Sequence, residues 1–332
     1  MRYLINSDHV ELVLKSSEPS EIISNNDFTI STTFKPSDNT GFTKCNEIRC
    51  KNQSFGLLYS VPTSKLQFKD RNAMVLELKN ESLYRQDTIS LELPLFLKSY
   101  NLIAASVREL HIALDGPGII EKHESLFKKE FLTRKRYLKM NEFTDDKTKT
   151  VTGITLGSRF SDKYVVIYNK TNELLISEKK YIADFWEQNG LIVNGKSIDR
   201  LELRLRTKEL QGLEKDLQLL NNQNFLASLI KNRSKNHLTF ISKKNKKEYN
   251  VIDWSGFNLH EIKKEKRINF HMSTQRVKST LKTIYLESNF EEKVFDTDFR
   301  DFLLEKYRLA AWYLKSQYRW KKENPVFKNQ VL

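Results

Sequence analysis

Three short segments of this chain alternate between polar and apolar residues, and this alternation constrains the fold more than any other feature of the sequence. The segments are "HIALD" at 111–115, "YVVIYNK" at 164–170 and "DRLELRLR" at 199–206. Successive side chains of a strand point to opposite faces, so each segment predicts a strand with one apolar and one polar face. We therefore expect an antiparallel sheet that buries one of its faces in a core.

The polar faces of these predicted strands carry residue types that are common in catalytic sites. Alternation does not establish that the three strands are neighbours, so their meeting at one site is a hypothesis. The three sets are His111 with Asp115, Tyr164 with Tyr168 and Lys170, and Arg200 with Glu202, Arg204 and Arg206.

Asp115 and Glu202, with His111 as a third group, suit a divalent metal ion. Carboxylate oxygens favour Mg²⁺, and an imidazole shifts the preference toward Mn²⁺. A metal ion at this place would polarise a phosphodiester while a tyrosine oxygen attacks it. Lys170 beside Tyr168 would favour the phenolate or contact the phosphate oxygens.

Each of these residues also has a purely structural interpretation, which the sequence leaves open. Asp115 precedes Gly-Pro and fits a residue that caps a turn. Glu202 lies between two arginines, as in an ion-pair ladder on an open sheet face. Tyr168 fits ordinary packing on a strand, and His111 fits a hydrogen-bonded histidine of a sheet.

The charge of the chain favours a polyanionic partner such as nucleic acid. The 332 residues include 56 Lys and Arg against 42 Asp and Glu, a formal charge of +14. From residue 206 onward there are 26 basic and 15 acidic residues, so most of the excess lies in the last part of the chain. An excess of this kind is the electrostatic footprint of DNA binding, although a lysine-rich surface that only keeps a protein in solution gives the same sum.

The order of elements predicts an α+β domain at 1–206 and a mainly helical, basic region at 207–332 that binds DNA. In the first domain an antiparallel sheet with flanking helices would carry the site. The helix at 177–190 would begin at Ser177 and stop at Gly190. The other expected strands are 56–62, 65–70, 73–79 and 107–116, with a hairpin at 150–170; the other expected helices are 88–106, 119–140, 207–232, 273–288 and 296–322, and 242–250 reads as a charged linker.

The remaining features favour a cytoplasmic protein that does not contact membranes. The sequence begins "MRYLINSDHV", without the apolar core of a signal peptide, and no run approaches the length of a membrane span. Cys45 and Cys50 form one pair, which is too few ligands for a zinc site, so we expect two ordinary thiols.

Several motifs within 107–206 resemble those of the replication initiation factor family, which comprises rolling-circle plasmid initiators of Gram-positive bacteria, relaxases of conjugative elements and filamentous-phage initiators. An earlier strand of that family reads Asp-x-Ala-x-Asp; this chain has His111 in place of the first acid and Asp115 at the second. None of the six histidines are two residues apart, so the His-x-His metal motif of other rolling-circle enzymes is missing. The matching residues are Gly153 and Thr155; the turn Gly157, Ser158, Arg159 and Ser161; the strand end Tyr168, Asn169 and Lys170; and Arg200 with Glu202.

The resemblance implies a metal-dependent endonuclease and strand transferase that nicks origin DNA. Tyr168 matches the family's nucleophile, which would form a 5′-phosphotyrosyl link and release a 3′-OH. Arg159 and Ser161 of the turn, with Arg200 and Arg204, would contact phosphate oxygens. The alternatives are a conjugative relaxase of the same family and a regulator that binds a DNA site without cutting it. The implied partners are single-stranded and duplex DNA, a helicase and a second copy of the chain.

Overall fold

The computed structural model describes the chain at residues 3–16, 22–33, 41–63, 72–128, 131–133, 140–144, 150–177, 179–191, 197–260 and 262. The chain divides into two compact units, 1–264 and 265–332. The second unit lies outside the described residues, as do the predicted strand at 65–70 and the predicted helices at 273–288 and 296–322.

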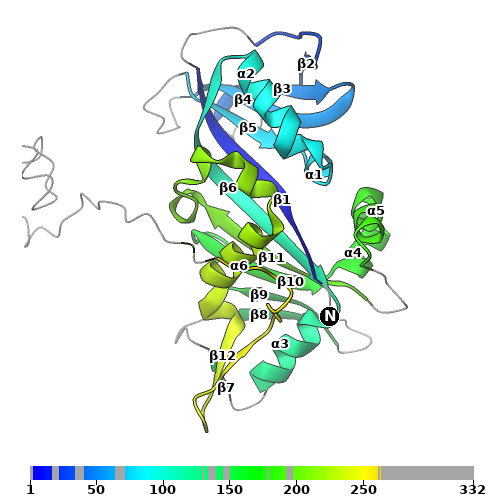
Figure 1. Ribbon diagram of the computed structural model, residues 1–332, viewed down its shortest axis with the longest axis vertical. Helices are drawn as coiled ribbons and strands as arrows, with labels where there is room; N and C mark the ends of the chain where they lie inside the picture. Colours follow the sequence, from blue (N-terminus) through cyan, green and yellow to red (C-terminus); the bar gives the residue numbers. More distant parts are fainter. Residues whose placement is uncertain are drawn as a thin grey trace, which may run out of the picture. The chain divides into compact units, whose positions relative to one another are not determined.

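A large antiparallel sheet dominates the first unit, so the predicted α+β class is confirmed (Figure 1). Its strand order is β2-β3-β4-β5-β1-β6-β11-β10-β9-β8. A smaller sheet of three strands has the order β13-β12-β7. The strands are β1 Leu4–Ser16, β2 Phe28–Thr32, β3 Phe42–Cys50, β4 Gln53–Pro62, β5 Met74–Leu78, β6 Leu102–Gly116, β7 Phe131–Thr133, β8 Met140–Thr144, β9 Val151–Leu156, β10 Lys163–Asn169, β11 Asp199–Arg206, β12 Thr239–Ser242 and β13 Glu248–Asn250.

The helices of the described residues are short, apart from α6. None of them is apolar over a length that would cross a membrane. The α-helices are α1 Asn80–Leu83, α2 Leu93–Ser99, α3 Ile119–Lys128, α4 Lys170–Ser177, α5 Lys180–Gln188 and α6 Gln223–Leu238; the π-helix is η1 Thr88–Glu92, and the 3₁₀ helices are η2 Thr207–Glu209, η3 Leu213–Lys215 and η4 Leu217–Asn221.

The apolar face of the sheet forms the main core, and the alternation read from the sequence is confirmed there. Leu110, Ile112 and Leu114 of β6 are fully buried, as are Leu201, Leu203 and Leu205 of β11. Helix α6 packs against β1 and β10, and α3 packs against β9, β10 and β11 (Figure 1). Both helices contribute to this core, through Leu226, Leu229 and Ile230 of α6 and Ile119, Ile120 and Leu126 of α3.

The polar face of the sheet is covered at one end by a second, smaller apolar cluster. Leu4 of β1 packs there with Ile182 and Trp186 of α5 and with Leu191 and Ile198. This cluster lies at the end of β6 that carries Asp115, because Leu4 is the register partner of Asp115. The other end of the polar face keeps its charged side chains half-buried or exposed.

Two predicted helices are shorter than expected, because strands take over part of each. The segment 88–106 is helical only to Ser99, and β6 begins at Leu102. The segment 119–140 is helical only as α3, and β7 and β8 follow. Leucine and phenylalanine at helical spacing also fit a long strand that is buried on one face, so periodicity misplaced these boundaries.

The polar stretch after β10 also differs from the prediction. Lys170 does not extend β10 but begins α4, and its backbone N–H donates to the carbonyl of Ile198 at 2.9 Å. Ser177 ends α4, and Lys179 precedes α5, so Ser177 is not the N-cap of that helix. The predicted stop at Gly190 is confirmed by its φ of 66°, in the region that favours glycine.

The predicted boundary near residue 206 is not where the compact unit ends. Helix α6 packs on the sheet, and β12 pairs with both β7 and β13. The segment 242–250, expected to be a charged linker, holds parts of β12 and β13. The chain from 207 to 262 therefore completes the core of the first unit, and a separate DNA-binding region beyond it stays a prediction.

Asp199 at the start of β11 fixes the beginning of α3. Its Oδ2 accepts a hydrogen bond from the backbone N–H of Ile120 at 3.0 Å, which satisfies a donor that the helix itself leaves unpaired. We expect Asp199→Ala to lower the free energy of unfolding by about 1–3 kcal/mol in urea denaturation, because a buried donor loses its partner. Asp216→Ala is the control, since Asp216 is exposed and its side chain accepts from the backbone N–H of Gln218 at the start of the short η4. An equal loss in both variants would contradict this role for Asp199.

Candidate active site

The three strands predicted to carry the site are adjacent in the sheet. The order β6-β11-β10 places Asp115, Arg200 and Tyr168 in one cross-strand row. The next row holds Ala113, Glu202 and Val166, and the third holds His111, Arg204 and Tyr164. Directly opposed residues of neighbouring strands have Cβ atoms about 5 Å apart, so the side chains of each row can interact.

Arg200 is the centre of a buried ion-pair network at the covered end of this face. Its side chain is 0% exposed. Its Nε and Nη2 donate to the two carboxylate oxygens of Asp115 at 2.6 and 2.7 Å, and its Nη1 donates to Asp8 at 2.8 Å. Burial opposes the charged guanidinium, but these carboxylates outweigh that effect and hold the pKa of Arg200 well above its ordinary value.

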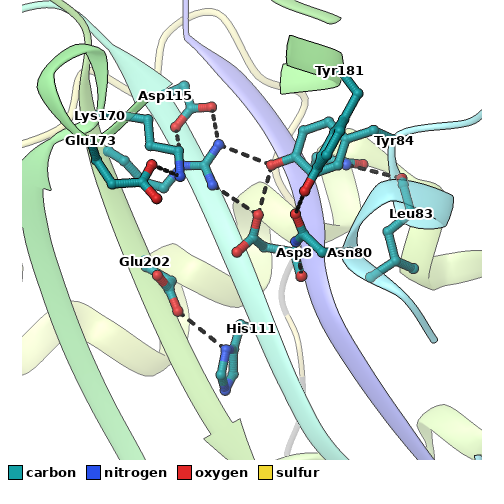
Figure 2. Close-up of polar contacts among 12 residues, drawn as sticks. Asp8, Asn80, Leu83, Tyr84, His111, Asp115, Lys170, Glu173, Tyr181 and Glu202 are labelled. Atoms are coloured by element: carbon teal, nitrogen blue, oxygen red, sulfur yellow. Dashed lines mark hydrogen bonds and ion pairs between the residues drawn. The ribbon is translucent and has the colours of Figure 1, made fainter. Parts of the chain in front are cut away.

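Two further side chains, Tyr84 and Trp186, close the network around Arg200. Arg200 Nη2 also donates to the Tyr84 hydroxyl at 2.9 Å, and that hydroxyl donates to Asp8 at 2.7 Å. Trp186 Nε1 donates to Asp115 at 2.8 Å. Figure 2 shows Asp8, Tyr84 and Asp115 converging on this point from β1, the segment after α1, and β6. The guanidinium therefore has no open side for a phosphate, and the predicted contact of Arg200 with DNA does not fit this position.

Asp8 is a site residue that the sequence analysis did not find. It lies at a register shift in the pairing of β1 with β6, between Ser7 and His9. The shift inserts Asp8 as an extra residue, as a β-bulge does. Burial raises the pKa of Asp8, but the charge of Arg200 and the hydrogen bond from Tyr84 overcome this and lower it strongly. The only signal in the sequence is the break in alternation at "NSDH", which does not reveal a partner 192 residues away.

A second polar cluster surrounds Glu202, nearer the open end of the face. His111 Nδ1 lies 3.2 Å from Glu202 Oε1, and His111 Nε2 lies 2.8 Å from Glu109 Oε1 (Figure 2 shows the pair with Glu202). Arg204 Nε donates to Glu202 at 2.8 Å. The His9 ring lies 4.6 Å from the ring of His111. Both nitrogens of His111 face carboxylates, which suits the protonated imidazole.

The predicted metal ligands do not form a metal site in this arrangement. Both oxygens of Asp115 are bound by Arg200, and Glu202 is bound by His111 and Arg204. Within the described ranges, no three His, Cys, Asp or Glu side chains are grouped so that they would hold a metal ion. Asp115, Glu202 and His111, each already bound by its neighbours, therefore do not fit a shared metal ion in this arrangement.

Tyr168 is half-buried beside the Arg200 network. Burial raises the pKa of its phenol well above the ordinary value of 10.0; Arg200 opposes this shift and Glu202 adds to it. The phenol therefore keeps its proton at neutral pH. Gly153 of β9 is the register partner of Tyr168, so the position directly opposite the tyrosine on that strand carries no side chain.

Lys170 is buried next to Tyr168. Its Nζ lies 5.6 Å from the centre of the Tyr168 ring and forms an ion pair with Glu173 (Figure 2 shows this pair). Burial and the charge of Arg200 lower the pKa of Lys170, while Glu173 raises it. Lys170 therefore lies beside the tyrosine, at the start of α4, with Glu173 as its partner; its role toward the phenolate or a phosphate stays a prediction.

The turn between β9 and β10 carries two predicted phosphate contacts, Arg159 and Ser161, and their side chains differ in whether they are already bound within the turn. Ser158 and Arg159 are exposed. The Ser161 hydroxyl bonds to the carbonyl of Ser158 at 2.7 Å and also to that of Lys163. Its single hydrogen is therefore used within the turn, and Ser161 shapes the turn where a phosphate contact was predicted. Arg159 is free to contact a phosphate.

The His111 cluster predicts a pH dependence of stability. Burial lowers the pKa of His111, but Glu109 and Glu202 outweigh this, so the folded-state pKa lies above the ordinary 6.5. A histidine with a raised folded-state pKa stabilises fully below 6.5 and loses this contribution as the pH rises through the folded-state value. We expect His111→Gln to lower the free energy of unfolding more below pH 6.5 than above it, in urea titrations across pH.

His123 on α3 is the matched control for this measurement. It is buried beside Phe240, and burial lowers its pKa to about 4. The effect of pH on stability through His123 is opposite to that through His111. Because the unfolded chain binds the proton better, His123 lowers the free energy of unfolding as the pH falls from 6.5 toward about 4. His123→Phe should relieve that loss. The same pH trend in both variants would contradict the charge state assigned to His111.

The sequence matches no family model and no curated protein. Among solved structures, the chain is similar to the rolling circle replication initiator protein from Geobacillus stearothermophilus, with a TM-score of 0.42 and 13% sequence identity. The similarity covers 76% of this chain and 94% of that chain.

Proposed function

We propose that this chain is a rolling-circle replication initiator that nicks origin DNA with Tyr168 and rejoins the strand. The observation that supports it best is the row formed by Asp115, Arg200 and Tyr168 on adjacent strands. Four of the residues that resemble the family's motifs lie in this row, namely Asp115, Arg200, Tyr168 and Gly153, whereas the turn at 157–161 lies beyond the other end of β10. Tyr168 stands there half-buried, next to a lysine and opposite a glycine.

In the proposed reaction the phenol oxygen of Tyr168 attacks the phosphorus of a phosphodiester. The new bond joins Tyr168 to the 5′ phosphate, and the bond from phosphorus to the 3′ oxygen breaks. The phenol loses its proton and the leaving 3′ oxygen gains one, so the number of protons is unchanged. Because its pKa is raised, the phenol must lose its proton as the attack proceeds.

The neighbouring residues would position the tyrosine and stabilise charge. The ammonium of Lys170, 5.6 Å from the ring centre, favours negative charge on the phenol oxygen. Arg200 holds β1, β6 and β11 together beside the tyrosine and acts as a positioning residue. Arg159 and Arg204 are the arginines of the predicted set whose side chains reach solvent, so they are the ones proposed to contact phosphate.

A nicking assay on supercoiled DNA tests this function. The full chain is mixed with a plasmid that carries the replication origin of its native element, once with Mn²⁺ or Mg²⁺ and once with a chelator. The proposal expects relaxed plasmid with the protein attached to the 5′ end at the nick. The two arms also show whether the reaction needs a divalent metal ion, as the family resemblance implies.

A second function, binding of a DNA site without cutting, is favoured by one observation. Each carboxylate of the predicted catalytic set is already neutralised, Asp115 by Arg200 and Glu202 by His111 with Arg204. The same assay separates the two functions. Tight, sequence-specific binding of origin DNA with neither relaxation nor adduct in either arm would support the regulator and refute the initiator.

A further inference from the structure

Phe160, in the turn between β9 and β10, is exposed to an extent that the fold does not explain. Its side chain is 88% exposed, and it makes no ring contact with any residue that the structure describes. Burial of a phenylalanine is normally favourable, so a ring left in water adds nothing to the stability of this domain. The position instead offers a flat aromatic face to a ligand.

The turn that carries Phe160 is held in one shape. Gly157 has a φ of 99°, which other residues rarely adopt. The Ser161 hydroxyl binds the carbonyl of Ser158 at 2.7 Å, and Arg206 N donates to the carbonyl of Asp162 at 2.9 Å. The Lys208 ammonium lies 3.0 Å from Asp162. The ring is therefore carried on a fixed support that is tied to the end of β11.

Two arginines lie at the turn beside Phe160, and the acidic residues near it, Asp162 and Glu109, pair with Lys208 and Arg206. Arg159 precedes Phe160 and is exposed, with no hydrogen bond or ion pair to another described residue. The guanidinium of Arg206, 43% exposed, lies 3.5 Å from the carbonyl of Phe160 and 3.7 Å from Glu109. Arg204 lies over the ring of Tyr164 at 5.9 Å. An aromatic ring flanked by arginines is the arrangement by which proteins hold single-stranded nucleic acid, with bases stacked and phosphates neutralised.

We propose that Phe160 stacks on a base of single-stranded DNA, with Arg159 on an adjacent phosphate. Single strands are favoured over duplex because only an unpaired base exposes its face to a side chain. The direction of the DNA rests on the proposed function: the single-stranded DNA would run along β10 from Phe160 past Tyr164 to Tyr168. A β-strand rises about 3.3 Å per residue, so Tyr164 and Tyr168 alone are separated by about 13 Å, and the DNA path is several nucleotides long.

The test measures binding of a labelled oligothymidylate of about 12 nucleotides, a length typical for one single-stranded binding site. It uses fluorescence anisotropy with the full chain at several salt concentrations. Phe160→Ala should weaken binding about 5- to 150-fold, the range of losses when one stacked base loses its aromatic partner. Phe160→Trp should bind as tightly as the native chain or tighter. Phe160→Leu should behave like Phe160→Ala, because an apolar group without a ring cannot stack.

Salt separates the roles of the ring and the arginine. Phe160→Ala should leave the slope of log affinity against log salt unchanged, since stacking releases no counterions. Arg159→Ala should reduce that slope by about 0.7, the value for one phosphate contact on a single strand. Leu175→Ala, at an 80% exposed position on α4, is the control and should change neither quantity.

Native affinity in Phe160→Ala, or in Phe160→Leu, would overturn the inference. These outcomes are independent of the nicking reaction, because only binding is measured. Weaker oligonucleotide binding by Phe160→Ala, with no covalent adduct in the nicking assay, would refute the proposed function and support this binding site. An adduct at Tyr168 in the nicking assay, with native binding by Phe160→Ala, would support the proposed function and refute this binding site.

Discussion

Tyr168→Phe should abolish the covalent adduct between protein and origin DNA, with a loss of about 10⁴- to 10⁶-fold in the rate of nicking. The substitution removes only the phenol oxygen that would form the bond to phosphorus. The half-buried ring remains, so its packing beside Lys170 and β9 is retained. Affinity for origin DNA and the midpoint of urea denaturation should therefore stay close to those of the native chain.

Tyr164→Phe is the matched control for this prediction. Tyr164 lies on the same strand and the same face, four residues before Tyr168, and its ring contacts Arg204. Nicking should continue in this variant, because its hydroxyl has no proposed role in the reaction. Persistence of the adduct in Tyr168→Phe, with its loss in Tyr164→Phe, would transfer the nucleophile to Tyr164. Persistence in both would place it on neither.

Arg200→Met should cost about 3–5 kcal/mol in the free energy of unfolding, the range for removing one partner of a buried ion pair. The substitution leaves the carboxylates of Asp8 and Asp115 buried without their main counter-charge. It also removes a donor to the Tyr84 hydroxyl. Urea denaturation of the full chain measures the effect, and the variant is expected to be near its unfolding threshold at room temperature.

Arg204→Met provides the comparison within the same strand. Arg204 lies two residues from Arg200 on the same face and also pairs with a carboxylate, but its side chain is 33% exposed. We expect a smaller loss, of about 1 kcal/mol, because Arg204 is partly exposed and its buried partner Glu202 keeps its ion pair with His111. Adding Asp8→Asn to Arg200→Met should recover part of the stability, because it removes one stranded charge. Similar losses for the two arginines would contradict the assignment of Arg200 to a buried structural network.

This pair of variants also changes how a loss of nicking at Asp115 should be interpreted. Substitution of Asp115 would reduce nicking whether Asp115 binds a metal ion or serves only as the partner of Arg200. Stability would fall together with nicking only if Asp115 is the partner of Arg200, because it also accepts from Trp186 in the buried network. Nicking by Asp115→Asn is therefore informative only when it is compared with the urea midpoint of the same variant.

Much of the sheet could be predicted from the sequence because alternation is a local property. The leucines of β11 recur at every second position and are fully buried, and the same holds for β6. The β9–β10 hairpin followed from two apolar runs around a polar turn. The helices flanking the sheet were harder to predict, since the apolar and small residues at the start of β6, from Leu102 to Ala105, also fit the end of a helix.

The sequence by itself determined which side chains share a face of each strand, because the pleat has a period of two residues whatever the strand packs against. It placed Tyr168 on one face of β10 and Asp115 on one face of β6. Only the tertiary structure decided what those side chains meet. Strand order joined β6, β11 and β10, and a register shift in β1 brought Asp8 to Arg200. Since charge pairing depends on distances across the sheet, burial turned Arg200 and Asp115 from expected ligands of phosphate and metal into partners of each other.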